Sequence, residues 1–211
     1  MKGQAPERFG RRSIRLKGYD YSQAGGYYVT IVTQLRECFF GKICTGEMIF
    51  NDAGKMVNAG WMSLQERFPN IETDVFQVMP NHLHGIIIIH NPELVGAGLV
   101  PAHDASLVHA HATRATTRVA PTLGEIIGTF KSITTHKYIQ GVDEFVWPVF
   151  YKRLWQRNYY EHILCDQADY ERIAGYILDN PANWDIDDEN PHNATGAGDA
   201  AARDQVHGWA D

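Results

Sequence analysis

The clearest candidates for chemistry in this sequence are two histidines, His82 and His84, in a Met-Pro-Asn-His-Leu-His-Gly stretch that precedes four isoleucines. In a β-strand, side chains two residues apart point to the same face, so both imidazoles can bind one metal ion. The isoleucine run indicates a central, buried strand, where imidazoles are costly unless they are hydrogen-bonded or metal-bound. Gly85 follows directly and is expected to let a ligand approach the backbone.

The histidine pair alone leaves its role open. Two structural histidines with satisfied hydrogen bonds would give the same pattern. With oxygen ligands and phosphate the pair suits Mg²⁺ or Mn²⁺, whereas a third histidine would favour Zn²⁺. His162 is a candidate for that third position. His90 is not, because it lies about 26 Å from His82 on the same strand, at about 3.3 Å per residue.

A second candidate region ends in Tyr-Ile-Leu-Asp-Asn-Pro, at the end of a predicted helix. Asn180 lies four residues after Tyr176, one turn further along the same edge of that helix. Taken alone, a tyrosine on a helix edge is typical of packing, and an asparagine before proline is typical of a helix end. This segment by itself does not indicate catalysis.

Together the two regions resemble HUH-type single-tyrosine transposases, and most closely the REP-associated tyrosine transposases. The resemblance covers residues 10–90 and 121–184, with the motifs MPNHLHG, LWQRNYYEHI and YILDNP in the expected order. It implies an α+β fold with a ferredoxin-like HUH endonuclease core, an antiparallel sheet with helices packed on it. It also implies that His82, His84 and Asn180 hold a divalent metal, Mg²⁺ or Mn²⁺, and that Tyr176 is the nucleophile.

These roles imply an enzyme that cleaves and rejoins single-stranded DNA at hairpin (REP-like) sites through a 5′-phosphotyrosine intermediate. A tyrosine hydroxyl, whose ordinary pKa is about 10, becomes a nucleophile when a cation or base favours the phenolate. Two other functions stay open. One is a nucleic-acid-binding module that has lost cleavage, and the other is a metal-dependent phosphoesterase that does not need Tyr176.

The expected DNA contacts are basic and aromatic side chains. Residues 1–17 carry a net charge of +5 in a chain whose overall charge is −6, so this arm can bind the phosphates of a hairpin stem. The second motif interleaves arginine with tyrosines, as a surface that stacks bases and binds phosphates does. Trp155, in the same motif, is expected in the core. The residues expected to bind DNA are Arg11, Arg12, Arg15, Arg157, Tyr159 and Tyr160.

Hydrophobic periodicity predicts the elements that position these residues. Alternating β-branched and aromatic residues indicate strands, and apolar residues at steps of three and four indicate helices. A capping box, Thr122-x-x-Glu125, marks one helix start. The predicted order is strand 27–35, strand 48–50, helix 57–68, strand 74–79, strand 82–90, a helix from 122, edge strand 145–150 and helix 166–177.

Length and composition fit one globular domain. The chain has 211 residues, 44% hydrophobic and 21% charged, which excludes wholesale disorder. We expect a catalytic domain at 1–184 with a flexible insertion at 91–121, which is rich in Ala, Gly, His and Thr, and an acidic disordered tail at 185–211.

Cellular context and partners are also constrained. Three scattered cysteines favour a reducing, cytoplasmic location, and no apolar run is long enough to span a membrane. The expected partner is single-stranded or hairpin DNA, bound by a monomer with no obligate protein partner.

Overall fold

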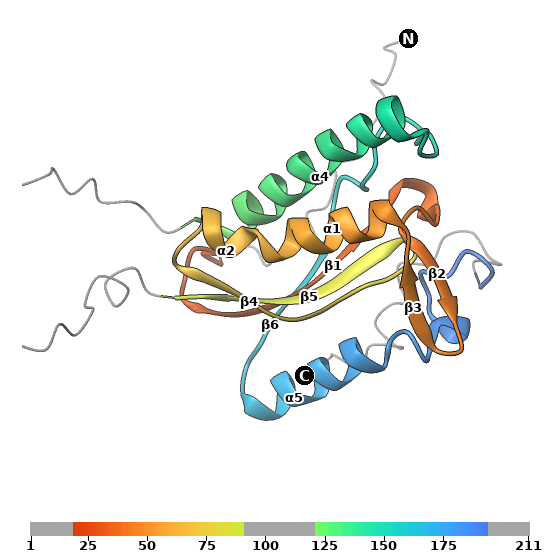
Figure 1. Cartoon of the computed structure of the whole chain (residues 1–211). Coiled ribbons are helices and arrows are strands. Elements are labelled where there is room, and N and C mark those ends of the chain that lie inside the picture. Colours follow the sequence, from red (N-terminus) through yellow and green to blue (C-terminus); the bar gives the residue numbers. More distant parts are fainter. Residues whose placement is uncertain (1–18, 91–120, 194–211) are drawn as a thin grey trace, which may run out of the picture.

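A four-stranded antiparallel sheet forms the centre of the computed structural model, which describes residues 19–90 and 121–193 (Figure 1). Arg11, Arg12, Arg15 and nearly all of the expected insertion lie outside the described residues. The strands follow the order β4-β5-β1-β6. They are β1 (Gly25–Val32), β4 (Ile71–Val78), β5 (His82–Ile89) and β6 (Tyr160–Ile163).

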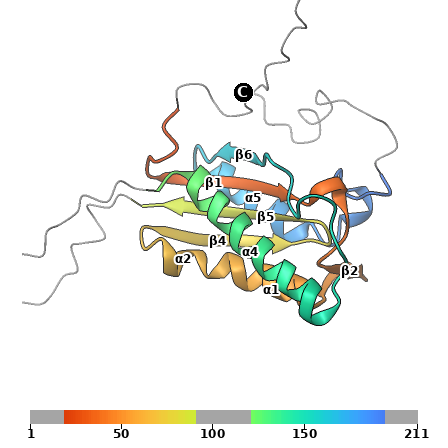
Figure 2. The same ribbon diagram turned by 90° about the horizontal axis from the view of Figure 1, so that it is seen from above.

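Helices cover both faces of this sheet (Figures 1 and 2). One face carries α1 (Asp52–Met62), α2 (Leu64–Arg67) and α4 (Leu123–Phe145), and the other carries α5 (Gln167–Asp179). No helix in the described part of the chain is both long and apolar enough to cross a membrane.

Chain order and sheet order together define the fold class. Along the chain the sheet strands and their packed helices run β-α-β-β-α-β, and the sheet order places the first and third strands in the middle. This is the ferredoxin-like arrangement, so the predicted α+β fold is confirmed. A separate hairpin, β2 (Gly41–Cys44) and β3 (Glu47–Phe50), stands beside the sheet.

Local sequence signals explain where the helices begin. The side chain of Asn51 accepts a hydrogen bond from Gly54 N, which caps α1. Thr122 and Glu125 form the predicted capping box of α4. Asp166 caps α5 by accepting from Asp169 N.

Two predicted elements differ from the structure. The helix predicted at 57–68 is two helices, α1 and α2, that meet at Ser63, whose hydroxyl donates to the carbonyl of Gly60. The edge strand predicted at 145–150 is wrong: α4 extends to Phe145 and ends at Val146 in a left-handed conformation, and 146–150 form no strand. The strand that follows α4 and forms one edge of the sheet is β6, and β4 forms the other edge.

The beginning of the acidic tail also needs correction, because residues 185–193 fold back on the domain. A 3₁₀-helix, η2 (Trp184–Ile186), crosses the expected boundary at 184, and Asp187 and Asn190 are buried. Side-chain amides hold this turn: Asn190 Nδ2 donates to the carbonyl of Trp184 at 2.9 Å and Asn193 Nδ2 to that of Asp185 at 2.7 Å. The remainder of the tail lies outside the described residues.

Gly85 has a packing role that differs from the expected ligand approach. A Cβ atom at this position would lie 2.5 Å from Trp61 Cζ2 and 3.2 Å from Phe76 Cβ. The space beside Gly85 is therefore filled by the fully buried Trp61 of α1, which holds this helix close to the centre of the sheet.

The substitution Gly85→Ala should destabilise the protein by about 1–3 kcal/mol, because the added methyl group overpacks the Trp61 ring. Urea unfolding followed by circular dichroism measures this change. Gly128→Ala, in α4 with no atom within 4 Å of the added Cβ, is the matched control. It should stabilise by about 0.5–1 kcal/mol through reduced chain entropy. Equal stability in the two variants would contradict the packing role of Gly85.

Candidate active site

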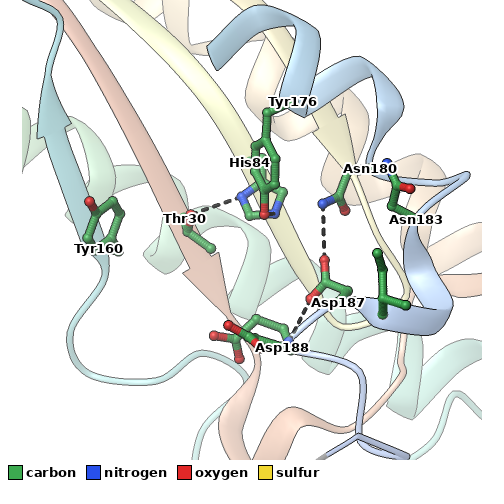
Figure 3. Close-up of a pocket in the computed structure, with 10 residues that line it drawn as sticks. Thr30, His84, Tyr160, Tyr176, Asn180, Asn183, Asp187 and Asp188 are labelled. Atoms are coloured by element: carbon green, nitrogen blue, oxygen red, sulfur yellow. Dashed lines mark hydrogen bonds between the residues drawn. The ribbon is translucent and has the colours of Figure 1, made fainter. Parts of the chain in front are cut away.

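The two histidines lie on the face of the sheet that α5 covers, as strand geometry predicts. Both are almost completely buried, and their Nε2 atoms are 3.0 Å apart. Strand pairing places His82 opposite Val32 and His84 opposite Thr30 on β1. The two imidazoles therefore meet on this face of the sheet, and Figure 3 shows one of them, His84, beside Tyr176 of α5.

Asn81 fixes which nitrogen of His82 carries the proton. Its Nδ2 donates to the carbonyls of Arg36 and Glu189 at 2.9 and 2.7 Å, so its Oδ1 is the atom that faces His82 Nδ1 at 2.8 Å. An amide oxygen only accepts hydrogen bonds, so Nδ1 of His82 must be the donor. Burial lowers the pKa of His82, although Asp187 and Glu189 act in the opposite direction. The neutral ring thus presents the lone pair of Nε2.

His84 is surrounded by hydroxyl groups from β1. Its Nδ1 lies 2.8 Å from Tyr28 Oη and 2.9 Å from Thr30 Oγ1. The Tyr28 ring also stacks on the imidazole, with centroids 5.8 Å apart. Because Nδ1 is occupied by these hydroxyls, Nε2 is the atom that His84 directs toward His82.

Tyr176 lies next to this pair. Its Oη is 3.4 Å from His84 Nε2, and the two ring centroids are 5.2 Å apart (Figure 3). Burial raises the pKa of Tyr176, and the carboxylates of Asp187, Asp188 and Glu189 raise it further, whereas a hydrogen bond from Tyr28 lowers it. The hydroxyl therefore keeps its proton until a positive charge or a base favours the phenolate.

Polar contacts at both edges of the sheet hold α5 in place. Tyr170 donates to Asp74 of β4 at 2.7 Å, and His162 of β6 is 2.9 Å from the Asp169 carboxylate. Between them, Ile173 and Ile177 are fully buried against the sheet. His162 is thus engaged in anchoring the helix, away from the group that His82 and His84 form, so it does not serve as the third histidine considered above.

Asn180, which is predicted to be a ligand, lies beside an aspartate that the sequence patterns do not indicate. Asn180 Nδ2 donates to Asp187 Oδ2 at 3.0 Å, and that oxygen lies 3.8 Å from His82 Nε2. Asp187 had been assigned to the tail. The available signal was the run of turn-forming Asp and Asn side chains at 187, 190 and 193.

The donor atoms of this group fit a divalent cation. The ligand atoms of His82, His84 and Asp187 all lie within 4.8 Å of one another. Asn180 Oδ1 is buried without a hydrogen-bond partner, so it is available as a further oxygen ligand. Two imidazoles with oxygen donors suit transition cations such as Mn²⁺.

The residues expected to bind DNA divide between three places. Tyr160 lines a pocket of about 300 Å³ together with Thr30, His84 and Tyr176. Arg157 is exposed and lines a separate groove beside α4, whereas Tyr159 is half-buried and packs against the core. Trp155 is buried, as expected, and donates to Thr134. The three N-terminal arginines lie outside the described residues.

Comparison with solved structures identifies the class of fold. The structure is similar to that of a REP-associated tyrosine transposase bound to a REP hairpin, with a TM-score of 0.50 and 16% identity, over 94% of this chain and 89% of that chain. This likeness confirms the fold that the sequence resemblance implied.

Comparison of sequences then gives the family. The chain is 38% identical over 178 residues to an uncharacterized protein of Haemophilus influenzae, covering 84% of this chain and 91% of that protein. It belongs to the family of that protein. The sequence matches no family model.

Asp187→Asn should weaken Mn²⁺ binding by about tenfold or more, because a charged ligand becomes neutral. Titration of Mn²⁺ followed by the EPR signal of the free ion measures the affinity without DNA. Asp188→Asn removes the same charge at the next residue, which is exposed, and should stay within about threefold of the unmodified protein. Equal losses in both variants would contradict ligation by Asp187.

Proposed function

We propose that this protein is a DNA strand transferase that cleaves and rejoins single-stranded DNA at hairpin sites, with Tyr176 as the nucleophile. The observation that carries the proposal is the placement of the Tyr176 hydroxyl 3.4 Å from Nε2 of His84, inside a pocket beside a group of metal-binding side chains. The fold shared with a REP-associated tyrosine transposase supports the same reaction class.

The chain's own residues supply most of the chemistry. His82, His84 and Asp187, with Asn180, would hold Mg²⁺ or Mn²⁺, which as a Lewis acid neutralises charge on the phosphate and on the leaving oxygen. The Tyr176 hydroxyl loses its proton and its oxygen attacks the phosphorus, while the bond to the 3′-oxygen breaks and that oxygen takes up a proton. This leaves a 5′-phosphotyrosine and a free 3′-hydroxyl. Because one phosphodiester replaces another, a 3′-hydroxyl can reverse the reaction and rejoin the strand.

A basic groove beside α4 is a suitable site for the hairpin stem. It encloses about 440 Å³ and is lined by Lys131, His136, Arg153 and Arg157. Arg157 lies three residues before Tyr160, or about 10 Å at the rise of an extended chain. Single-stranded DNA that leaves the groove can therefore follow the edge strand β6 to the pocket that contains Tyr176. The transposase with a similar fold was itself solved with a REP hairpin.

Tyr176→Phe should abolish the covalent protein–DNA adduct with a labelled hairpin oligonucleotide and Mn²⁺, because the attacking oxygen is gone. The substrate is chosen from the palindromes that flank the gene, and the adduct is detected on a denaturing gel. Tyr27→Phe, which removes a hydroxyl that donates to the carbonyl of Gln23 on the other face of the sheet, is the control and should form the adduct.

Two other results would identify the alternative functions. Cleavage that survives in Tyr176→Phe but is lost in His82→Ala would indicate a metal-dependent phosphoesterase. Tight hairpin binding with no cleavage in the unmodified protein would indicate a binding module.

Replacing Arg153 and Arg157 together by alanine should weaken hairpin binding and lower the slope of log affinity against log salt by about 2, one unit for each lost phosphate contact. Fluorescence anisotropy of a labelled hairpin between low and high salt measures this slope. Arg67→Ala, an exposed arginine of α2, is the control and should leave the slope unchanged. An unchanged slope in the double variant would exclude the groove as the stem site.

A further inference from the structure

A buried tyrosine on the central strand β1 connects the histidine pair with Tyr176. Tyr28 is fully buried, yet its hydroxyl contacts polar atoms on several sides. Its Oη lies 2.8 Å from His84 Nδ1 and accepts a hydrogen bond from Thr30 Oγ1 at 3.0 Å, and its ring lies edge-on to that of Tyr176 with centroids 6.4 Å apart. A buried hydroxyl is costly unless its hydrogen bonds are satisfied, so packing alone would favour phenylalanine here.

The distance between the two histidines restricts where their protons are. His82 carries its proton on Nδ1, because Asn81 accepts from it, so its Nε2 has a lone pair. Nε2 of a neutral His84 lies 3.0 Å from that lone pair and 3.4 Å from the Tyr176 hydroxyl. It either carries the proton and donates to His82, or carries a lone pair that faces a cation or accepts from Tyr176. In the first form His84 has its proton on Nε2, and in the second form on Nδ1.

We propose that Tyr28 is a positioning residue that couples these two forms of His84 to Tyr176. In the first form Nδ1 of His84 is an acceptor, and the Tyr28 hydroxyl donates to it. In the second form Nδ1 is a donor, so the Tyr28 hydroxyl turns and donates to Tyr176. The imidazole stays neutral in both forms, since one N–H bond breaks at Nε2 and one forms at Nδ1.

The second form satisfies every hydroxyl in the cluster. Nδ1 of His84 donates to Thr30 and Thr30 donates to Tyr28, so the Tyr28 hydroxyl has its own proton available for Tyr176, whose ring lies edge-on to it with centroids 6.4 Å apart. A hydrogen bond to a charged oxygen is stronger than one to a neutral oxygen. Occupation of the histidine site would thereby direct a donor toward the oxygen that must become negative during attack.

This inference rests in part on the proposed function, but its first test needs no DNA. In the ¹⁵N-histidine-labelled full chain, long-range ¹H–¹⁵N NMR distinguishes the two neutral forms of His84. Addition of Mg²⁺, which is diamagnetic, should move the proton of His84 from Nε2 to Nδ1. A proton that stays on the same nitrogen before and after Mg²⁺ would overturn the coupling.

The second test separates metal binding from attack. Tyr28→Phe should lower the rate of adduct formation at saturating Mn²⁺ by about tenfold or more, because a donor to a charged oxygen is lost. Its Mn²⁺ affinity, measured by EPR, should change by less than about threefold, because Thr30 still accepts from His84. Combining Tyr28→Phe with Thr30→Val removes both hydroxyls that contact Nδ1 of His84 and should weaken Mn²⁺ binding by about tenfold or more.

The neighbouring residue supplies the control. Tyr27 is also fully buried on β1, and its hydroxyl donates to the carbonyl of Gln23, so Tyr27→Phe removes the same atom from the other face of the sheet. Tyr27→Phe should have the same rate of adduct formation and the same Mn²⁺ affinity as the unmodified protein. A Tyr28→Phe protein that matches Tyr27→Phe in rate would overturn the inference. If Mg²⁺ moves the proton of His84 from Nε2 to Nδ1 but the unmodified protein forms no adduct, the proposed function is refuted instead.

Discussion

The close approach of two buried imidazoles is the constraint on which the rest of the site depends. Their Nε2 atoms lie 3.0 Å apart in a part of the sheet that solvent does not reach, so each ring must have its remaining polar atom satisfied by protein. Asn81 does this for His82, and the hydroxyls of β1 do it for His84. Asn81 and the hydroxyls of Tyr28 and Thr30 are therefore buried polar groups in a region of the sheet where apolar side chains are usual.

The position of the histidine pair also determines how accurately helix α5, which carries Tyr176, must be held. The proposed role of Tyr176, as a nucleophile beside a cation, requires a position that is fixed to within about half an ångström. Contacts at Asp74 and His162 hold α5 at both edges of the sheet, and its isoleucines pack between them. Tyr176 is thus positioned by its own chain, through elements that precede it in the sequence.

The sequence predicts much of this arrangement because the relevant signals are local. The shared face of His82 and His84 follows from the period of a strand, and the start of α4 follows from a capping box. Asp187 could not be found in this way. Its carboxylate accepts from Asn180 and from the backbone of Glu189. Glu189 in turn contacts Arg36 and Asn81, which are far away in sequence, whereas the composition of this segment resembles a solvated tail. Gly85 was misinterpreted for a similar reason, since Trp61 approaches it from a different element.

The two carbonyls bound by Asn81 have a consequence for the order of folding. One belongs to Arg36 and the other to Glu189, so a single amide joins segments 153 residues apart. Contacts of such long range form late, after the sheet has brought the local elements together. During synthesis, the sheet and its covering helices can assemble while residue 189 is still within the ribosome. The hydrogen bond from Asn81 to Glu189 forms only when that segment docks, so the sheet can fold before the ring of His82 is held in its final orientation.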